Sequence, residues 1–239
     1  MTAEARGPLH GTLAVVTGGG RGIGRAIARA LAAEGADLAI CGRTQAELDE
    51  AALAIHEAGR GAIDVLAVRC DVSSSDDVAR FAAEVRARVR DPMVVVNNAG
   101  WVARGRVDEQ PEDIWRQVLD INLVGAYLVA RAFLPAMRAA QAGRIINIAS
   151  ISGHRGTSSL TAYCAAKHGL VGLTRALAEE LRDDHVQVNA VCPGSVDTAM
   201  LVGSGFAPAM VADDVARVVR FLAVEAPAAM TGACLDVLG

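Results

Sequence analysis

Residues 13–24 read LAVVTGGGRGIG, an apolar run that passes directly into a glycine-rich turn. The apolar run predicts a buried strand, and residues 22–34, with an Ala/Ile/Leu stripe at helical spacing, predict a helix. Gly18, Gly22 and Gly24 leave the backbone bare where the strand becomes the helix. A pyrophosphate needs such close backbone approach together with the positive end of a helix. The stretch therefore predicts a nucleotide-binding turn at the start of an α/β domain.

The spacing of these glycines indicates which class of nucleotide-binding turn this is. The pattern is G-x-x-x-G-x-G, with Arg21 and Ile23 inside it, and it differs from the commoner G-x-G-x-x-G fingerprint. No Gly-Lys-Ser/Thr follows, so the turn is not a phosphate-binding P-loop. An ordinary tight strand–helix turn is the alternative. The flanking strand and helix favour a dinucleotide site that includes Gly18, Arg21, Gly22, Ile23 and Gly24.

The rest of the chain repeats this alternation of strand and helix. We expect strands at 13–17, 37–41, 64–68, 93–96, 144–149, 186–191 and 234–237, and helices at 22–34, 45–58, 74–90, 111–140, 162–183 and 213–223. The strands are continuous apolar runs, which is typical of a parallel sheet covered on both faces. The pattern predicts one doubly wound, Rossmann-like α/β domain over residues 1–239, with a sheet of about seven strands. We expect residues 1–11 to be an N-terminal tail and 194–212 to be a substrate loop.

Composition limits the partners of the protein. The chain has 239 residues, 52% of them hydrophobic, and a net charge of −4, so we expect neither a nucleic-acid nor an anionic-membrane surface. Its five cysteines are widely spaced and lack a C-x-x-C motif, so we interpret them as buried reduced thiols and expect no metal site. Residues 1–11 carry no apolar signal-peptide core, and no apolar run of membrane-spanning length is free of charge or glycine. A cytoplasmic protein is the expectation.

The end of the second strand bears on cofactor preference. An acidic residue there would hydrogen-bond the ribose 2′-hydroxyl of NAD. This chain has Arg43 instead, whereas Asp37 lies at the opposite end of that strand. Arg43 is placed to pair with a 2′-phosphate, and Arg21 is placed to close on the same group. The sequence therefore favours NADP(H), and the alternative is that either arginine is a solvated surface charge.

Polar residues follow several other strands at their carboxyl ends. Asp71 and Val72 follow the third strand, where the carboxylate suits an adenine amino group, with helix capping as the competing role. Residues 97–100, Asn-Asn-Ala-Gly, suit a wall beside a bound ribose, although asparagines also make ordinary turns. Residues 193–198 follow the sixth strand. Open α/β sheets bind ligands at this edge, so the convergence predicts one site.

The chemistry is predicted from Tyr163 and Lys167, which lie four residues apart, and therefore one turn along one face of the expected helix. A phenol normally keeps its proton up to a pKa of about 10, and a neighbouring ammonium lowers that pKa. Such a tyrosine exchanges a proton near neutral pH, as carbonyl reduction or alcohol oxidation requires. Ser150, at the end of the fifth strand, is placed to hold the substrate oxygen. Asn122 interrupts the stripe of the long helix, where we expect it to bend the helix and hold a water that relays protons to Lys167.

Together these residues resemble the short-chain dehydrogenase/reductase family, in its single-domain branch, over nearly the whole chain. The resemblance implies a catalytic tetrad of Asn122, Ser150, Tyr163 and Lys167, in which Tyr163 is the general acid or base and Lys167 also binds the nicotinamide ribose. It also implies a homotetramer or a homodimer, paired through the long helix and the Tyr/Lys helix. The cofactor-binding residues that we expect are Gly18, Arg21, Gly22, Ile23, Gly24, Arg43, Asp71, Val72, Asn98, Ala99, Gly100, Tyr163, Lys167, Pro193, Gly194, Val196 and Thr198, with Thr198 at the nicotinamide carboxamide.

Within the family the chain is most similar to the 3-oxoacyl-acyl-carrier-protein reductases, through Arg21, Arg43 and residues 191–194. The stretch between Thr198 and Asp213 looks shorter than in that group, and the usual C-terminal glycine pair is missing, which implies a more open substrate site. We expect an NADP(H)-dependent oxidoreductase that acts on a ketone or secondary alcohol, of 3-oxoacyl type or another carbonyl. Two alternatives are a non-catalytic NADP(H)-binding sensor or scaffold and an isomerase or dehydratase. Apolar loop residues predict either a substrate pocket or ordinary lid packing: Trp101, Leu201, Val202, Phe206 and Met210.

Overall fold

The computed structural model describes residues 7–239, and positions 1–6 of the expected N-terminal tail lie outside this range. Residues 7–11 form a turn that packs on the domain. Leu9 is buried, and its backbone N–H donates to the carbonyl of Glu34 at 2.9 Å. This part of the expected tail is therefore a part of the folded domain.

Seven parallel strands form a single sheet in the order β3-β2-β1-β4-β5-β6-β7, which confirms the expected fold class. Every pair of neighbouring strands is parallel. The strands are β1 (Leu13–Thr17), β2 (Asp37–Gly42), β3 (Val65–Arg69), β4 (Val94–Asn97), β5 (Gly143–Ile148), β6 (Val186–Pro193) and β7 (Cys234–Val237).

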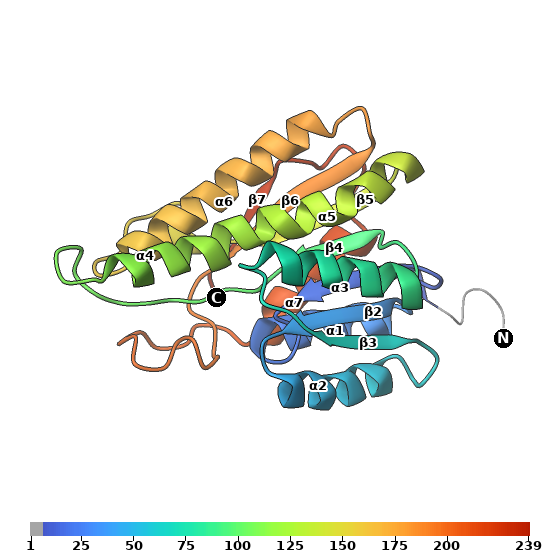
Figure 1. Ribbon diagram of the computed structural model, residues 1–239, viewed down its shortest axis with the longest axis horizontal. Helices are drawn as coiled ribbons and strands as arrows, with labels where there is room; N and C mark the ends of the chain where they lie inside the picture. The colour runs from blue at the N-terminus through green and yellow to red at the C-terminus, as the bar shows by residue number, and fades with distance from the viewer. Residues whose placement is uncertain (1–6) are drawn as a thin grey trace.

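Helices cover both faces of this sheet (Figure 1). One face carries α1 (Gly22–Ala33), α2 (Gln45–Ala58) and α7 (Ala212–Val224). The other face carries α3 (Ser75–Arg88), α5 (Gly125–Ala140) and α6 (Thr161–Glu180), and α4 (Glu112–Leu119) leads into α5. Within the described residues, the ends of the expected elements differ from the observed ends by at most three residues.

The strands are apolar along their whole length because both sides of the sheet are buried. In β1, Leu13 and Val15 pack in the cluster beneath α3 and α5, whereas Ala14 and Val16 pack in the cluster beneath α1 and α7. Successive side chains of a strand point to opposite faces, so a doubly covered strand needs an apolar residue at every position.

The long helix expected over 111–140 is interrupted by a π-helical turn at Asp120–Val124. Asn122 lies in this turn, and its side-chain amide donates to the carbonyls of Val118 at 2.8 Å and of Trp101 at 2.7 Å. Single π turns inside α-helices often occur at functional sites. The expected irregularity at Asn122 is therefore present, as a local change of helix type.

The segment Glu112–Ala140 is long and apolar enough by composition alone to cross a membrane. In the fold it instead lies along the sheet, and its Val129, Phe133 and Met137 are fully buried in the core. Phe133 also meets Phe81 of α3 edge to face, with ring centroids 6.0 Å apart. The apolar composition is thus accounted for by packing within the domain.

The sheet positions the functional groups through its strand order. β1 lies between β2 and β4, so the chain progresses outward from β1 to β3 in one direction and from β4 to β7 in the other. A crevice forms where the direction reverses, at the carboxyl ends of the strands. The glycine turn after β1 and the residues after β4 meet at this point.

Candidate active site

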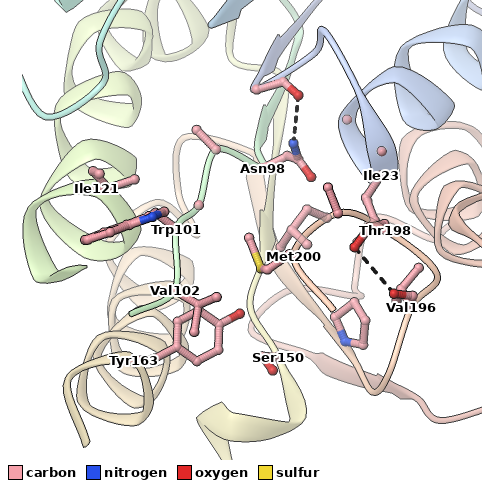
Figure 2. A pocket seen from close by; sticks show the side chains of 18 of the residues that line it. Ile23, Asn98, Trp101, Val102, Ile121, Ser150, Tyr163, Val196, Thr198 and Met200 are labelled. Atoms are coloured by element: carbon pink, nitrogen blue, oxygen red, sulfur yellow. Dashed lines mark hydrogen bonds between the residues drawn. The ribbon is translucent and has the colours of Figure 1, made fainter. Parts of the chain in front are cut away.

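A cavity of about 990 Å³ lies at the carboxyl ends of the strands. It is lined by the glycine turn after β1, the segments after β2 to β6, and the start of α6. Figure 2 shows Ile23 and Asn98 toward one end of this cavity, and Tyr163 and Ser150 toward the other. Such a volume is large enough for a cofactor together with a small substrate.

The glycine turn can exist only with glycine at its key positions. Gly18 has φ +65° and Gly22 has φ +52°, a backbone region that other residues rarely adopt. A Cβ on Gly24 would lie 2.2 Å from the carbonyl oxygen of Gly18, which is closer than atoms can pack. The result is bare backbone at the N-terminus of α1. This cradle fits the pyrophosphate of a nicotinamide dinucleotide.

Asn98 holds the glycine turn in place. Its side-chain amide donates to the carbonyl of Thr17 at 2.9 Å and more weakly to that of Gly18 at 3.3 Å. The hydroxyl of Thr17 in turn accepts the backbone N–H groups of Asn98 and Ala99, each at 3.0 Å. We call these contacts the Thr17–Asn98 clasp. The sequence analysis assigns no role to Thr17, although the sequence places its hydroxyl at the end of the first strand.

The two asparagines after β4 have different surroundings. Asn98 lines the cavity with Ala99 and Gly100, as expected for a wall beside a ribose. The Asn97 side chain instead donates to the side-chain oxygen of Asn147 at 2.9 Å, within the buried sheet. Asn97 therefore supports the sheet rather than the cavity wall.

Asp71 and Val72 line the cavity after β3. One carboxylate oxygen of Asp71 accepts the backbone N–H of Ser73 at 3.0 Å and the hydroxyl of Ser73 at 2.6 Å. The competing role, capping of α3, falls instead to Ser74, and Asp71 stabilises the turn before that helix. The adenine contact of Asp71 stays a prediction.

The two arginines expected at a 2′-phosphate are not equivalent. Both Arg21 and Arg43 line the cavity. Arg21 already pairs with Glu47 at 3.3 Å, whereas Arg43 has no carboxylate partner among residues 7–239. Arg43 is therefore the cation that is available to an anionic group at the end of β2.

Ser150 presents its hydroxyl at the other end of the cavity. It follows β5 and caps the short 3₁₀ turn Ile151–Gly153. Its Oγ accepts the backbone N–H of Ser152 at 3.1 Å, which leaves its hydroxyl proton to be donated elsewhere. The hydroxyl of Ser150 also lies near that of Tyr163, close enough to lower the pKa of the phenol. The two groups therefore converge on one point, where a substrate oxygen can accept from both.

Tyr163 keeps its proton in the environment that the protein provides. Desolvation of the hydroxyl raises its pKa to about 12, and this effect exceeds the opposing hydrogen bond from Ser150. The sequence led us to expect a lowered pKa. The direction is reversed because the protein atoms around the phenol remove hydration that its charged form would need. A phenol that is protonated at neutral pH can act as a proton donor.

Lys167 lies one turn further along α6 and is 3% exposed. Its ammonium is 5.6 Å from the centre of the Tyr163 ring and donates to the backbone carbonyl of Ile148 at 2.8 Å. Burial lowers the pKa of Lys167 to about 8. The expected shared face of Tyr163 and Lys167 is therefore present, but the charge of Lys167 does not outweigh the burial of the phenol.

Asn122 lies close to Lys167 without touching the cavity. A Cβ placed on Gly100 would be 2.9 Å from the Asn122 side-chain oxygen and 3.8 Å from the Lys167 ammonium nitrogen. Gly100 thus leaves a narrow gap between the two polar side chains. Asn122 is brought to the catalytic residues, and its role in a water relay stays a prediction.

The loop over 194–212 is irregular, as expected, and is tied back by a bridge between Val196 and Met210. Met210 was expected at the substrate pocket, but it is buried in the core beneath α7 and does not line the cavity. The other four apolar candidates do line it: Trp101, Leu201, Val202 and Phe206.

Thr198 also lines the cavity, with its methyl 3.4 Å from where a Cβ of Gly22 would lie. The expected cofactor residues Ile23, Pro193, Gly194 and Val196 line it as well.

Two further arginines line the substrate end of the cavity, Arg104 and Arg155. Arg104 donates to the carbonyl of Met200 at 3.5 Å, and its positive charge favours the ionised form of Tyr163. Neither arginine has a carboxylate partner within residues 7–239. Sequence reasoning missed both, because each lies in a polar loop with no periodic pattern around it.

Comparison with known proteins agrees with this geometry. The family model for short chain dehydrogenases matches residues 12–205. A 3-oxoacyl-[acyl-carrier-protein] reductase of Pseudomonas aeruginosa is 36% identical, over 97% of this chain and 97% of its own. A trans-4-hydroxycyclohexanecarboxylate dehydrogenase of Sinomonas cyclohexanicum is 37% identical over 95% of this chain and 91% of its own. A crystal structure described as a putative short-chain alcohol dehydrogenase from Sinorhizobium meliloti 1021 superposes with a TM-score of 0.89, at 32% identity and 95% coverage of both chains.

The raised pKa of Tyr163 can be measured directly. The chain has two tyrosines, so a Tyr127→Phe variant leaves Tyr163 as its only phenol. We expect less than about a tenth of it as phenolate at pH 10, where a free tyrosine is about half ionised. Ultraviolet difference spectroscopy reports the phenolate, circular dichroism confirms that the fold persists, and the Tyr127→Phe/Tyr163→Phe double variant supplies the blank. Half ionisation at or below pH 10 would contradict the dominance of burial.

Proposed function

We propose that this chain, which belongs to the short-chain dehydrogenase family, is an NADP(H)-dependent oxidoreductase acting on a ketone or secondary alcohol. One observation carries the proposal. The hydroxyls of Ser150 and Tyr163 meet in the cavity, with the buried ammonium of Lys167 behind them. A protein that only senses the cofactor has no need of this arrangement.

When bound, the nicotinamide supplies or accepts the hydride. In the direction of reduction, the substrate carbonyl oxygen accepts a hydrogen bond from Ser150, whose Oγ is fixed by the Ser152 N–H. Tyr163 gives its proton to that oxygen as the general acid. The positive charge of Lys167, 5.6 Å from the centre of the ring, stabilises the phenolate that remains, and the charge of Arg104 acts in the same direction. In oxidation the same proton returns to Tyr163.

The preference for NADP(H) rests on Arg43. Its guanidinium lines the cavity at the end of β2 and has no carboxylate partner within the described residues. A 2′-phosphate offers the planar, bidentate acceptor that arginine binds well. Arg21 is the weaker candidate, because its pairing with Glu47 would have to be broken or shared.

The substrate end of the cavity favours an anionic substrate. Arg104 and Arg155 line it, whereas the carboxylates that line the cavity, Glu47 and Asp71, lie at the cofactor end. Apolar side chains of Trp101 and the 194–212 loop complete the lining, so the substrate would combine an apolar body with a carboxylate or a similar group. The similar dehydrogenase of Sinomonas cyclohexanicum acts, by its name, on a hydroxycyclohexanecarboxylate.

We also propose a cytoplasmic homo-oligomer, a tetramer or dimer. On the long helix, Val118 and Ile121 are buried within the chain, whereas Val124 is 37% exposed. Tyr127, one turn from Val124, is 46% exposed. These two side chains form an apolar strip on the long helix that a second copy would cover.

A Tyr163→Phe variant tests the catalytic assignment. We expect turnover with NADPH and a reactive ketone to fall by about 10²–10⁴-fold, because the proton donor is lost. NADPH binding, followed by its fluorescence, should stay nearly intact. Tyr127→Phe makes the same chemical change outside the cavity and should leave turnover unchanged. Equal turnover in the two variants would refute the role of Tyr163 as proton donor. If the wild-type protein binds NADPH tightly but reduces no ketone, the alternative of a cofactor sensor would be favoured instead.

Cofactor preference is tested at the end of β2. We expect Arg43→Asp to weaken NADPH binding by at least about tenfold and to strengthen NADH binding, because a charged hydrogen bond is replaced by repulsion from a carboxylate. Arg25→Ala removes an arginine that pairs with Glu50 outside the cavity and should change neither affinity. An unchanged ratio of the two dissociation constants in Arg43→Asp would mean that other groups bind the 2′-phosphate.

The proposed substrate class is tested with two ketones of one ring size, 4-oxocyclohexanecarboxylate and cyclohexanone. We expect wild-type kcat/KM to be higher for the anion, and Arg104→Gln to lower it for the anion by about tenfold or more through loss of a charged contact. Activity on cyclohexanone should change little. Arg106→Gln is the control, because Arg106 pairs with Asp108 and Glu109 and does not line this cavity. An equal loss on both ketones would contradict recognition of the anionic group.

A further inference from the structure

Three side chains of types that commonly bind metal ions lie close together near Ser150. They are His154, Cys192 and Asp236, from the turn after β5, from β6 and from β7. Their donor atoms all lie within 4.8 Å of one another. None of the three lines the active-site cavity, so the catalytic arrangement does not account for the cluster.

The contacts within the cluster converge on a single nitrogen. His154 Nε2 is 3.2 Å from the sulfur of Cys192 and 3.3 Å from a carboxylate oxygen of Asp236. A ring nitrogen carries at most one proton, so it cannot make a full hydrogen bond to both acceptors. If the thiol instead donates to Nε2, the nitrogen carries no proton and cannot donate to the carboxylate. The arrangement also differs from a catalytic triad, in which the two partners contact opposite ring nitrogens.

We propose that His154, Cys192 and Asp236 form a binding site for a divalent zinc-type cation. Zn²⁺ bonds to nitrogen, sulfur and oxygen are about 2.0–2.3 Å long, so neighbouring ligands of a tetrahedral ion lie about 3.3–3.6 Å apart. The two contacts made by His154 are close to this spacing. One imidazole, one thiolate and one carboxylate is a donor set that suits Zn²⁺ and excludes Mg²⁺ and Ca²⁺, which prefer oxygen.

The surroundings of the cluster suit an ion as well. Cys192 is fully buried, whereas the side chains of His154 and Asp236 are 27% and 45% exposed, so an ion can enter from the solvent side. A water molecule on that side would complete four ligands. The backbone N–H of Ser150 lies near the Cys192 sulfur and favours its ionised form, as an outer-shell donor does in a metal site.

The ion would join three segments that the catalytic site depends on. His154 follows Ser150 by four residues, Cys192 directly precedes Pro193 at the cofactor, and Asp236 lies on the edge strand β7. Zinc binding would therefore stabilise the base of the active site. This inference is independent of the proposed substrate and of the preference for NADP(H).

Metal binding to the full-length protein tests the site. We expect isothermal titration with Zn²⁺ to give one equivalent per chain, and Co²⁺ in its place to show thiolate-to-metal charge-transfer absorption. Cys192→Ser should abolish that absorption. His154→Gln should weaken Zn²⁺ binding by at least about tenfold. Loss of an outer-shell partner already lowers metal affinity about tenfold, and loss of a direct ligand should cost no less. We expect Zn²⁺ to raise the melting temperature of the wild type but not of these variants.

Two matched controls separate this site from incidental binding. Cys164→Ser removes a partly exposed thiol outside the cluster, and His168→Gln removes an exposed imidazole that contacts the backbone carbonyl of Cys164. Both should bind Zn²⁺ as the wild type does. Absence of a stoichiometric Zn²⁺ site, or equal binding in His154→Gln and the wild type, would overturn the proposal.

Discussion

Desolvation of the Tyr163 hydroxyl and the Lys167 ammonium is the constraint on which the active site depends. α6 places them one turn apart, with Lys167 buried and Tyr163 half-buried at the wall of the cavity. Burial raises the pKa of the phenol to about 12 and lowers that of the ammonium to about 8, so each group favours its neutral form more than it would in water. In the proposed reduction, a carbonyl held by Ser150 would meet a protonated phenol, and the positive charges of Lys167 and Arg104 would stabilise the phenolate formed on proton transfer.

The sheet explains why these groups meet the cofactor cradle. Parallel strands end at one edge, and the reversal between β1 and β4 opens a crevice there. The Thr17–Asn98 clasp joins the two strands at this point and fixes the glycine turn. The same edge carries Ser150 after β5 and Pro193 at the end of β6. The cofactor end and the catalytic end of the cavity are thus built from neighbouring strands of one sheet. No hinge between domains is needed to align them.

Features set by local pattern could be predicted from the sequence, and features set by tertiary contacts could not. Continuous apolar runs gave the strands, and the glycine spacing gave the turn after β1, because both depend on neighbours in the chain. The pKa of Tyr163 depends on what surrounds it, so its direction was predicted wrongly. The pairing of Arg21 with Glu47 and the burial of Met210 also depend on distant residues. Cys192 follows His154 by 38 positions, and Asp236 follows Cys192 by 44. No short sequence motif can therefore contain all three residues of the cluster.

Hydride transfer to a carbonyl carbon is the central claim, and isotope transfer tests it most directly. NADPH deuterated at both C4 positions would be incubated with the protein and a panel of neutral and carboxylate-bearing ketones, and the alcohols analysed by mass spectrometry and NMR. The account predicts one deuterium on the carbinol carbon of at least one product, with none gained from deuterated solvent at that carbon. Alcohols without deuterium at that position, or no alcohol from any ketone despite bound NADPH, would contradict it.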